Sequence, residues 1–369
     1  MPVTVRSFAK INMGLCIGPR RSDGFHDLRT VYQTIGQHDI LRLRIERGSG
    51  IEIRCADPRV PTDRSNTCYR MLERAMPDLG ARGRVVVEIE KRLPVQGGLG
   101  GASGNAVSAL IALELALKKR LPPGERLRIA AEVGSDVPLF LIGGTVLGMG
   151  RGEDVYPLAD LPSAPCVIAT PEIGVSTPKA FADWDALLTA VPTGEALPTG
   201  SGQAHESERR YGAGGATGVP ARRAHGENPQ KLTPSEPSDR MLRFSREVSA
   251  WLSSVRSTKS KGRLSGVPAR GRGRAEILLL DLVRTGIEND FEQVVFPQYP
   301  ALRDVKCALE KAGAAYASLS GSGSAVYGIF RTRDAAARAV TKLRKQGIPA
   351  QATVTLTRAQ YWKKFQVSS

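Results

Sequence analysis

A glycine-rich run directly before an apolar segment constrains this chain more than any other feature. Five glycines lie between Gly97 and Gly104, and residues 106–117, which follow, have the composition of a buried helix. Backbone can approach a polyphosphate closely only where Cβ atoms are absent, and the free N–H groups at a helix start favour an anion. We therefore interpret the run as a phosphate-binding loop. An ordinary glycine-rich turn that leads into a helix is the alternative that this segment alone leaves open.

Two common nucleotide-binding motifs are excluded by the same run. A Walker A loop requires a Gly-Lys dipeptide, and none occurs in the chain. The dinucleotide motif Gly-x-Gly-x-x-Gly requires a third glycine at the position that Ser103 occupies. The run therefore indicates a phosphate-binding loop of another kind.

The size and composition of the chain favour a cytoplasmic protein of two domains. Its 369 residues are enough for two cores of ordinary size. No stretch approaches the roughly 18 consecutive apolar residues of a membrane span, and the first residues lack a basic leader followed by an apolar segment. The five cysteines are widely spaced and include no Cys-x-x-Cys pair, which argues against a disulfide framework and a zinc site. We expect reduced thiols and no membrane partner.

The location of the charge makes nucleic acid an improbable partner, although a net charge of +16 raises the question. Residues 191–275 hold 15 lysines and arginines against 7 aspartates and glutamates, so this segment carries half of the excess. From about residue 192 to 274 the chain is also rich in Gly, Pro and Ser, which predicts a disordered insertion with one helix near residues 240–255. A basic interaction arm is possible, but a tolerated surface insertion is favoured because long loops cost little entropy to close.

Apolar patterns predict an interleaved α+β fold. Strands are expected at residues 3–9, 39–46, 51–54 and 85–91, and helices at residues 67–76, 106–119, 299–311 and 333–345. The last quarter adds three more strands, at residues 315–320, 325–330 and 351–357. Their order with the last two helices is typical of a ferredoxin-like split βαβ sandwich.

A phosphate-binding loop is one requirement of phosphoryl transfer. The reaction also needs a base and a positive charge near the transferred group. Asp136, between a glycine and an apolar run, is the best candidate for a partly desolvated general base. An N-cap for a helix that begins near Pro138 is the alternative role for this aspartate. Lys10 closes the first expected strand, a position where lysine is usually solvated.

Two further segments have open interpretations. Asp23-Gly24 predicts a turn, after which Phe25 and His26 could stack on and hydrogen-bond a planar base. The Gly-Ser segment at residues 318–324 is either a tight hairpin or a second backbone wall of a ligand cleft, and composition does not decide between them.

Taken in chain order, seven segments closely resemble the signatures of the GHMP kinase superfamily. They are residues 9–12, 23–26, 94–105, 134–138, 175–177, 289–292 and 320–324, within a match that covers roughly residues 3–185 and 280–357. Within the superfamily they resemble the enzymes that use ATP to phosphorylate the 2-hydroxyl of methylerythritol linked to cytidine diphosphate, in non-mevalonate isoprenoid synthesis. Seven ordered matches are far more specific than any one of them.

The resemblance implies a two-domain fold with the active site in the cleft between the domains. Residues 1–160 would form the ATP-binding domain, like domain 2 of ribosomal protein S5, and residues 161–369 the ferredoxin-like domain that carries the insertion. A small-molecule substrate and a monomer or homodimer are expected.

The resemblance also implies roles for individual residues. Asp136 matches the general base, and Lys10 the residue that orients this base and stabilises the transferring charge. Asn66 falls where the family contacts adenine. The ATP phosphate loop would comprise Pro94, Val95, Gln96, Gly97, Gly98, Leu99, Gly100, Gly101, Ala102, Ser103 and Gly104. Phe25 and His26 match the cytidine pocket, and the acceptor side would be lined by Asn12, Thr177 and Phe181. Mg²⁺ is expected to arrive with ATP, without a dedicated carboxylate cluster.

Several positions depart from the family pattern. Gln96, Ala102 and Gly104 stand where the family more often has Gly, Gly and Ser. Phe25 replaces a more usual tyrosine, which preserves stacking. Ala102 fits the loop only if its φ is negative.

Two other functions compete with this hypothesis. A superfamily member could instead phosphorylate mevalonate, homoserine or a sugar, but those acceptors have no base to stack on the aromatic ring of residue 25. A nucleic-acid-binding protein could use an S5-like fold and the basic insertion.

Overall fold

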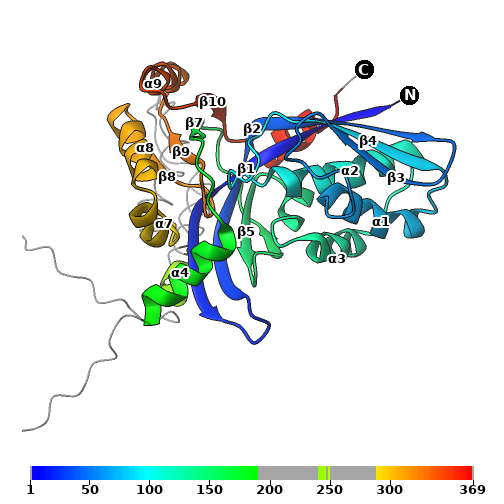
Figure 1. The fold of residues 1–369 in the computed structure, drawn as a ribbon, viewed down its shortest axis with the longest axis horizontal. Coiled ribbons are helices and arrows are strands. Elements are labelled where there is room, and N and C mark those ends of the chain that lie inside the picture. Colours follow the sequence, from blue (N-terminus) through cyan, green and yellow to red (C-terminus); the bar gives the residue numbers. More distant parts are fainter. Residues whose placement is uncertain (1, 190–239, 247, 250–287, 368–369) are drawn as a thin grey trace, which may run out of the picture.

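The computed structural model describes residues 2–189, 240–246, 248–249 and 288–367, which form two β-sheets with helices packed on them (Figure 1). The first sheet has the strand order β3-β4-β2-β5-β6, with β1 paired to β2. Its strands are β1 (Val3–Arg20), β2 (His26–Glu46), β3 (Gly50–Cys55), β4 (Arg84–Glu90), β5 (Thr145–Met149) and β6 (Asp154–Pro157). The expected strands of the first 91 residues are therefore confirmed, but the first two of them are much longer than the pattern indicated.

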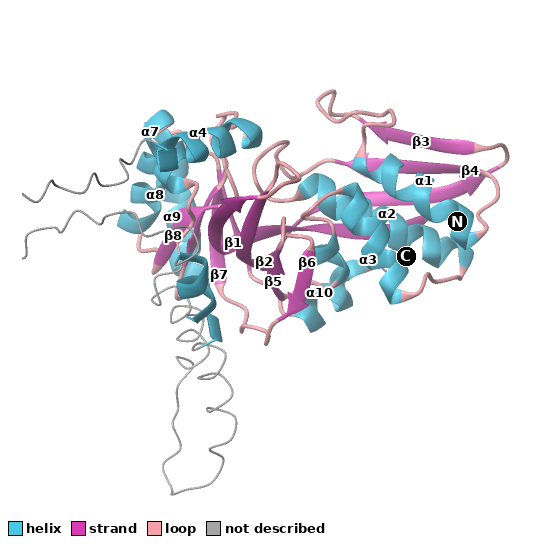
Figure 2. Cartoon of the chain, turned by 90° about the horizontal axis from the view of Figure 1, so that it is seen from below, coloured by secondary structure: helices cyan, strands magenta, loops and turns pink. Residues whose placement is uncertain are grey.

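Helices α1 (Thr67–Leu79) and α2 (Gly101–Leu117) pack against this sheet, and α3 (Pro123–Val133) packs on α1 in the same apolar cluster (Figure 2). Residues 104–110 of α2 are all buried. A helix that is apolar on every side is buried on every side, and α2 contacts both β1 and α1. The sequence prediction placed the start of this helix five residues too late, because it excluded the glycine-rich first turn.

The hairpin of β1 and β2 reaches both sheets' cores. Its register shifts between Phe8 and Ala9, again between Asn12 and Gly14, and once more between Ile17 and Arg20. Such irregularities bend a strand and increase its twist. They let one hairpin contribute side chains to all three apolar clusters of the described chain. Both faces of β1 are buried after Ala9, so apolar and polar residues no longer alternate there. For this reason the sequence predicted a strand that ends at residue 9.

The second sheet has the order β10-β7-β9-β8, with every neighbouring pair antiparallel. Its strands are β7 (Pro165–Ala169), β8 (Tyr316–Leu319), β9 (Val326–Ile329) and β10 (Ala350–Val354). Helices α8 (Pro300–Lys311) and α9 (Arg333–Lys345) pack on it, while α4 (Thr177–Thr189) and α7 (Glu292–Gln298) pack together beside it. The βαββαβ order confirms the ferredoxin-like prediction.

The end of the chain returns to the first core. Helix α10 (Arg358–Phe365), which the sequence pattern did not indicate, buries Tyr361 and Phe365 in the same cluster as Val5. The hydroxyl of Tyr361 donates to the carbonyl of Phe140 at 2.8 Å. The two chain ends consequently lie on the same side of the molecule (Figure 1). The expected domain boundary near residue 160 stays a prediction.

Most of the predicted insertion at residues 192–274 lies outside the described residues. Within it, residues 240–246 and 248–249 are helical, as expected for part of residues 240–255. Met241, Phe244 and Val248 are buried in the cluster between the two sheets. The Arg29 guanidinium of β2 donates to the carbonyl of Met241 and to the hydroxyl of Ser245. This short helix is therefore part of the core.

Within the described ranges, no helix is long and apolar enough to cross a membrane. All five cysteines are free thiols, and burial raises the pKa of Cys16 to about 12.

Candidate active site

Two adjoining cavities lie along the glycine-rich run. The smaller, of 330 Å³, is lined by residues 94–103 together with Asn66 and Lys91. The larger, of 710 Å³, extends from Lys10 to the turn of the β1–β2 hairpin. Gly98, Gly100 and Ser103 line both of them. Since small ligands occupy cavities of about 300–1,000 Å³, the arrangement offers room for two ligands that meet at the glycine-rich run.

The glycine-rich run bends in a way that only glycine allows at Gly98. Its φ is +72°, and a Cβ atom there would lie 2.1 Å from the carbonyl oxygen of Ser320. The Ser320 hydroxyl donates to the carbonyl of Gly98 at 3.0 Å, and the N–H of Ala325 donates to that of Gly97 at 3.1 Å. The Gly-Ser segment is therefore a hairpin turn between β8 and β9 and a wall of the cleft at once, so both alternatives hold.

The first turn of α2 faces both cavities. Its N-cap, Gly100, has φ +69° and supplies no capping side chain. A Cβ atom on Gly100 would lie 3.0 Å from Cγ of Lys10. The first N–H groups of a helix have no partner within the helix, so they are available to phosphate oxygens. The run has both properties that the sequence interpretation required, close backbone approach and an open helix start.

The three residues that depart from the family pattern differ in how much backbone strain they cause. Ala102 lies within α2, so its φ is helical and its methyl group causes no strain. Gly104 allows α2 to approach β1, because a Cβ atom there would lie 2.9 Å from the carbonyl oxygen of Phe8. Gln96 has φ +59°, in the left-handed region, which costs a residue with a Cβ atom about 1 kcal/mol.

Lys10 and Asp136 meet where the two cavities join. The Nζ atom of Lys10 lies 3.2 Å from Oδ2 of Asp136, and it donates to Oδ1 of Asn12 at 2.7 Å. The Lys10 side chain is 3% exposed and that of Asp136 is 34% exposed. Lys10 differs from most lysines at strand ends, because β1 continues past it and its side chain turns inward. Its N–H also donates to the carbonyl of Leu99 at 2.9 Å, which ties β1 to the glycine-rich run.

Asp136 does not act as a helix cap. The short 3₁₀ helix η1 (Pro138–Leu141) has Val137 as its N-cap and no side-chain capping bond. The helix-cap interpretation of Asp136 is therefore wrong, and its carboxylate faces the larger cavity.

Tyr32 is a site residue that the sequence pattern did not indicate. Its hydroxyl donates to Oδ1 of Asp136 at 2.8 Å, so Tyr32 and Lys10 each contact one carboxylate oxygen. Tyr32 is 1% exposed, and burial raises its pKa well above the ordinary value, which keeps the phenol protonated as a donor. In β2 it lies directly opposite Asn12. Only the register of this long-range pairing could have revealed it.

The residues expected on the acceptor side all line the larger cavity. The amide of Asn12 donates to the hydroxyl of Thr30 at 2.8 Å. Thr177, the first residue of α4, shares a hydrogen bond of 2.7 Å with the hydroxyl of Ser322. Phe181, one turn further along α4, stacks on the ring of His26 with 5.0 Å between ring centres. The structure thus brings residues from four distant segments to one cavity.

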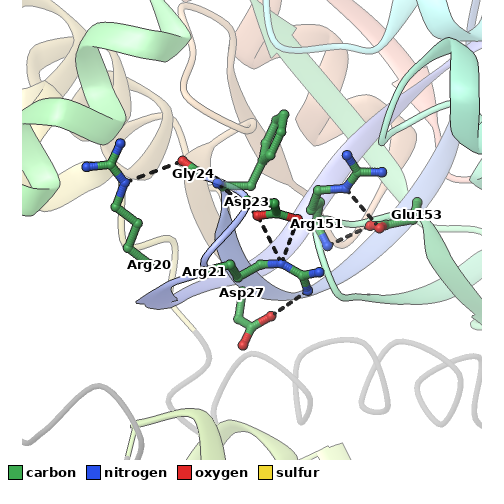
Figure 3. Close-up of polar contacts among 8 residues, drawn as sticks. Arg20, Arg21, Asp23, Gly24, Asp27, Arg151 and Glu153 are labelled. Carbon is green, nitrogen blue, oxygen red and sulfur yellow. Dashed lines mark hydrogen bonds and ion pairs between the residues drawn. The ribbon is translucent and has the colours of Figure 1, made fainter.

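The turn between β1 and β2 is held by its own charges (Figure 3). Gly24 has φ +84°, which confirms the predicted turn. The carboxylate of Asp23 accepts from the N–H of Phe25 at 3.1 Å and pairs with Arg21, which also pairs with Asp27 (Figure 3). These contacts fix the backbone on which Phe25 is presented.

Phe25 and His26 have different environments. Phe25 is 50% exposed, with the guanidinium carbon of Arg151 4.9 Å from its ring centre. His26 is 6% exposed, and its Nε2 lies 2.7 Å from Oδ1 of Asp185 on α4. Phe25 therefore leaves part of its ring open to a ligand beside Arg151, whereas one edge of His26 is already occupied. Arg151 and Asp185 also line the cavity, and no local motif indicated either of them.

Asn66 lies in the smaller cavity with a structural role of its own. It is the N-cap of α1, where its Oδ1 accepts from the N–H of Cys68 at 2.8 Å. Its Nδ2 donates to the carbonyl of Pro61 at 2.6 Å. A contact with adenine would have to share these atoms or use the backbone.

Asn289 and Asp290 connect the second sheet to the site. The amide of Asn289 donates to the carbonyls of Leu319 and Gly321, each at 2.8 Å. The carboxylate of Asp290 accepts from the N–H of Ile17 in β1 at 2.8 Å and pairs with Arg240. Burial raises the pKa of Asp290 to about 6.

Two family models match parts of the chain. Residues 66–144 match the family model described as the GHMP kinases N terminal domain, and residues 275–349 match the one described as GHMP kinases C terminal. The first match contains the glycine-rich run and Asp136, and the second contains the Gly-Ser turn.

Individual proteins align with almost the whole chain. A protein of Solibacter usitatus named 4-diphosphocytidyl-2-C-methyl-D-erythritol kinase is 32% identical over 92% of this chain and 84% of its own length. A protein of the same name from a Synechococcus species is 33% identical over 93% of this chain and 90% of its own. A crystal structure of 4-(cytidine 5'-diphospho)-2C-methyl-D-erythritol kinase superposes with a TM-score of 0.62, at 25% identity, over 95% of this chain and 98% of that one.

Proposed function

The chain belongs to the GHMP kinases and, within them, to the 4-diphosphocytidyl-2-C-methyl-D-erythritol kinase family, and we propose that it phosphorylates the 2-hydroxyl of that substrate with ATP. The products are the 2-phosphate and ADP, in non-mevalonate isoprenoid precursor synthesis. The named relatives, which align over more than four fifths of their own lengths, support this activity.

In the proposed reaction, Asp136 accepts the proton of the 2-hydroxyl as the oxygen attacks the γ-phosphorus of ATP. Phosphoryl transfer depends mainly on positioning and charge neutralisation. Lys10 supplies a buried positive charge 3.2 Å from the carboxylate, and Tyr32 holds the other carboxylate oxygen at 2.8 Å. Two fixed contacts on one carboxylate support its role as an oriented base.

ATP is the phosphate donor of the kinase family, and we propose that its phosphates lie against residues 97–103. The close backbone approach at Gly98 and the open start of α2 support this position. Mg²⁺ neutralises phosphate charge when it is bound and takes most of its ligands from phosphates and water. No group of three His, Cys, Asp or Glu ligands occurs within the described part of the chain, whereas Ser103 and Asp136 offer oxygen atoms in the cavity wall.

We propose that the cytidine end of the acceptor lies at the hairpin turn and the methylerythritol end at Asp136. The exposed ring of Phe25 supports stacking of a base. His26 and Phe181 would line the base pocket, and Asn12 and Thr177 the polyol part, since all four face the same cavity.

The observation that carries the proposal is the meeting of Lys10, Asp136 and Gly98–Gly100 at the junction of two cavities. The test uses the full chain with ATP and Mg²⁺ and one of four acceptors: the cytidyl-linked substrate, free methylerythritol, mevalonate or homoserine. ADP release and ³¹P NMR of the product should report turnover for the cytidyl-linked acceptor alone. Equal or faster turnover of mevalonate or homoserine would contradict the proposal.

Further properties remain parts of this proposal: a cytoplasmic location, a monomer or homodimer, and a domain division near residue 160. The alternative of nucleic-acid binding rests on the basic insertion, most of which lies outside the described residues. Salt-dependent binding of the full chain to single-stranded or duplex probes would support that alternative, and we expect none at physiological salt.

A further inference from the structure

Among the described residues, three lysine and arginine side chains line the larger cavity, and they differ in how many of their N–H donors already have an acceptor. Lys10 is bonded to Asp136 and Asn12. Arg20 and Arg151 lie on opposite sides of the hairpin turn in the view of Figure 3. The contacts of these two arginines leave donors for a ligand.

Arg151 is held at one edge only. Its Nε donates to Oε1 of Glu153 at 3.0 Å, and its backbone N–H donates to Oε2 of the same carboxylate at 2.6 Å (Figure 3). Its guanidinium lies over the ring of Phe25, and its side chain is 31% exposed. Among the contacts of the described residues, no acceptor is bonded to its two Nη groups. The guanidinium is thus oriented by Glu153 and Phe25 with its outer edge free.

The position of Arg151 matches a chemical requirement of the acceptor, an argument that rests on the proposed function. If the base stacks on Phe25 and the reacting hydroxyl lies at Asp136, the diphosphate must cross the cavity between them. A guanidinium offers paired N–H donors that match phosphate oxygens. We propose that Arg151 binds the diphosphate of the acceptor and thereby selects a nucleoside diphosphate-linked acceptor over the free polyol.

Arg20 is the weaker candidate for this contact. Its Nε reaches only the carbonyl of Gly24 at 3.5 Å, and its side chain is exposed. Fixing a long, mobile side chain costs conformational entropy. Arg20 therefore contributes less to diphosphate binding than Arg151 does.

The test compares ligands that differ only in phosphate. Binding of CDP and of cytidine to the full chain is measured by calorimetry for the wild type and for Arg151→Met. Because a hydrogen bond to a charged group contributes about 1.5–3 kcal/mol, CDP affinity should fall about 10- to 100-fold. Cytidine affinity should change less than about twofold, and Arg151→Lys should retain part of the CDP affinity because it keeps the charge. KM for the cytidyl-linked substrate should rise, with KM for ATP unchanged.

Arg21→Met is the matched control, since Arg21 lies in the same turn and pairs with Asp23 and Asp27 but does not line the cavity. It should leave the ratio of CDP to cytidine affinity unchanged. An equal loss of both ligands in Arg151→Met would overturn the proposal, because it would mean that Arg151 only supports the ring of Phe25. Unchanged CDP binding would overturn it as well. A wild type that binds CDP but does not turn over the cytidyl-linked substrate would instead contradict the proposed function.

Discussion

The two ends of the larger cavity are built on the same hairpin but are fixed to different degrees. At the Asp136 end, Lys10 and Tyr32 are almost fully buried, and each contacts one oxygen of the carboxylate. At the turn end, Phe25 is half exposed and Arg151 is held at one edge. Catalytic groups must be held close to the productive geometry, whereas a recognition surface can adjust to its ligand. The difference predicts that changes at the first end lower kcat, while changes at the turn end raise KM.

The largest expected effect is that of Asp136→Asn. Because the amide cannot accept the proton, kcat should fall by about 10²- to 10⁴-fold, with CDP affinity nearly unchanged. Steady-state kinetics and calorimetry measure the two quantities separately. Asp154→Asn, at an exposed position of β6, should behave as wild type. A raised KM with a normal kcat in Asp136→Asn would contradict the conclusion that the Asp136 end of the cavity determines kcat.

Gly98→Ala tests the boundary between the cavities. A Cβ atom 2.1 Å from the Ser320 carbonyl forces the glycine-rich run or the Gly-Ser turn to move, which should cost roughly 2–3 kcal/mol of unfolding free energy and raise KM for ATP. Denaturant unfolding and ATP kinetics are the measurements. Gly124→Ala in α3 is the control, since nothing lies within 4 Å of its added Cβ atom, and it should be neutral or stabilising by up to about 1 kcal/mol. Equal behaviour of the two variants would contradict the close approach.

A pH dependence is expected beneath the turn end, where Asp290 holds the N–H of Ile17. The pKa of Asp290 is about 6 in the folded chain and about 4 in an unfolded one. The folded state therefore binds this proton more tightly, so its contribution to stability is complete below about pH 4 and is lost as the pH rises through about 6. The loss amounts to roughly 2–3 kcal/mol. Between pH 4 and 7 the unfolding free energy of the wild type should fall by this amount relative to that of Asp290→Asn. Parallel curves for the two proteins would refute the raised pKa of Asp290.

Tyr32→Phe is the smallest change and the sharpest test of orientation. It removes one hydrogen bond to Asp136 and keeps the ring, so kcat should fall about 3- to 10-fold with KM unchanged. Steady-state kinetics measure both quantities. Loss of stability with an unchanged kcat would assign Tyr32 to packing alone.

The sequence indicated the chemistry of the site better than its full geometry. Lys10, Asp136 and the glycine-rich run lie in short motifs, so each could be found locally. Tyr32 required the register of β1 against β2, which shifts between Phe8 and Ala9 and again between Asn12 and Gly14. Arg151 and Asp185 reach the cavity only through the placement of β5 and α4, and no local pattern encodes such long-range packing.

The same reasoning applies to the fold. Helices with one apolar face and the ferredoxin-like order were predicted, since periodicity and turn residues specify them. Helix α10 was missed, because its buried residues, Tyr361 and Phe365, are separated by exposed lysines in a short segment. The second half of β1 was missed for a similar reason, because both of its faces are buried and its residues do not alternate between apolar and polar.

The helical residues 240–246 and 248–249 restrict how the protein can be shortened. Excising residues 192–274 in one piece would also remove Met241, Phe244 and Val248 and leave a hole between the two sheets. It would also remove Arg240, the ion-pair partner of Asp290, and the Met241 carbonyl, which accepts from Arg29. A minimal chain for crystallisation or assay should therefore be made with two separate cuts, one on each side of this helix.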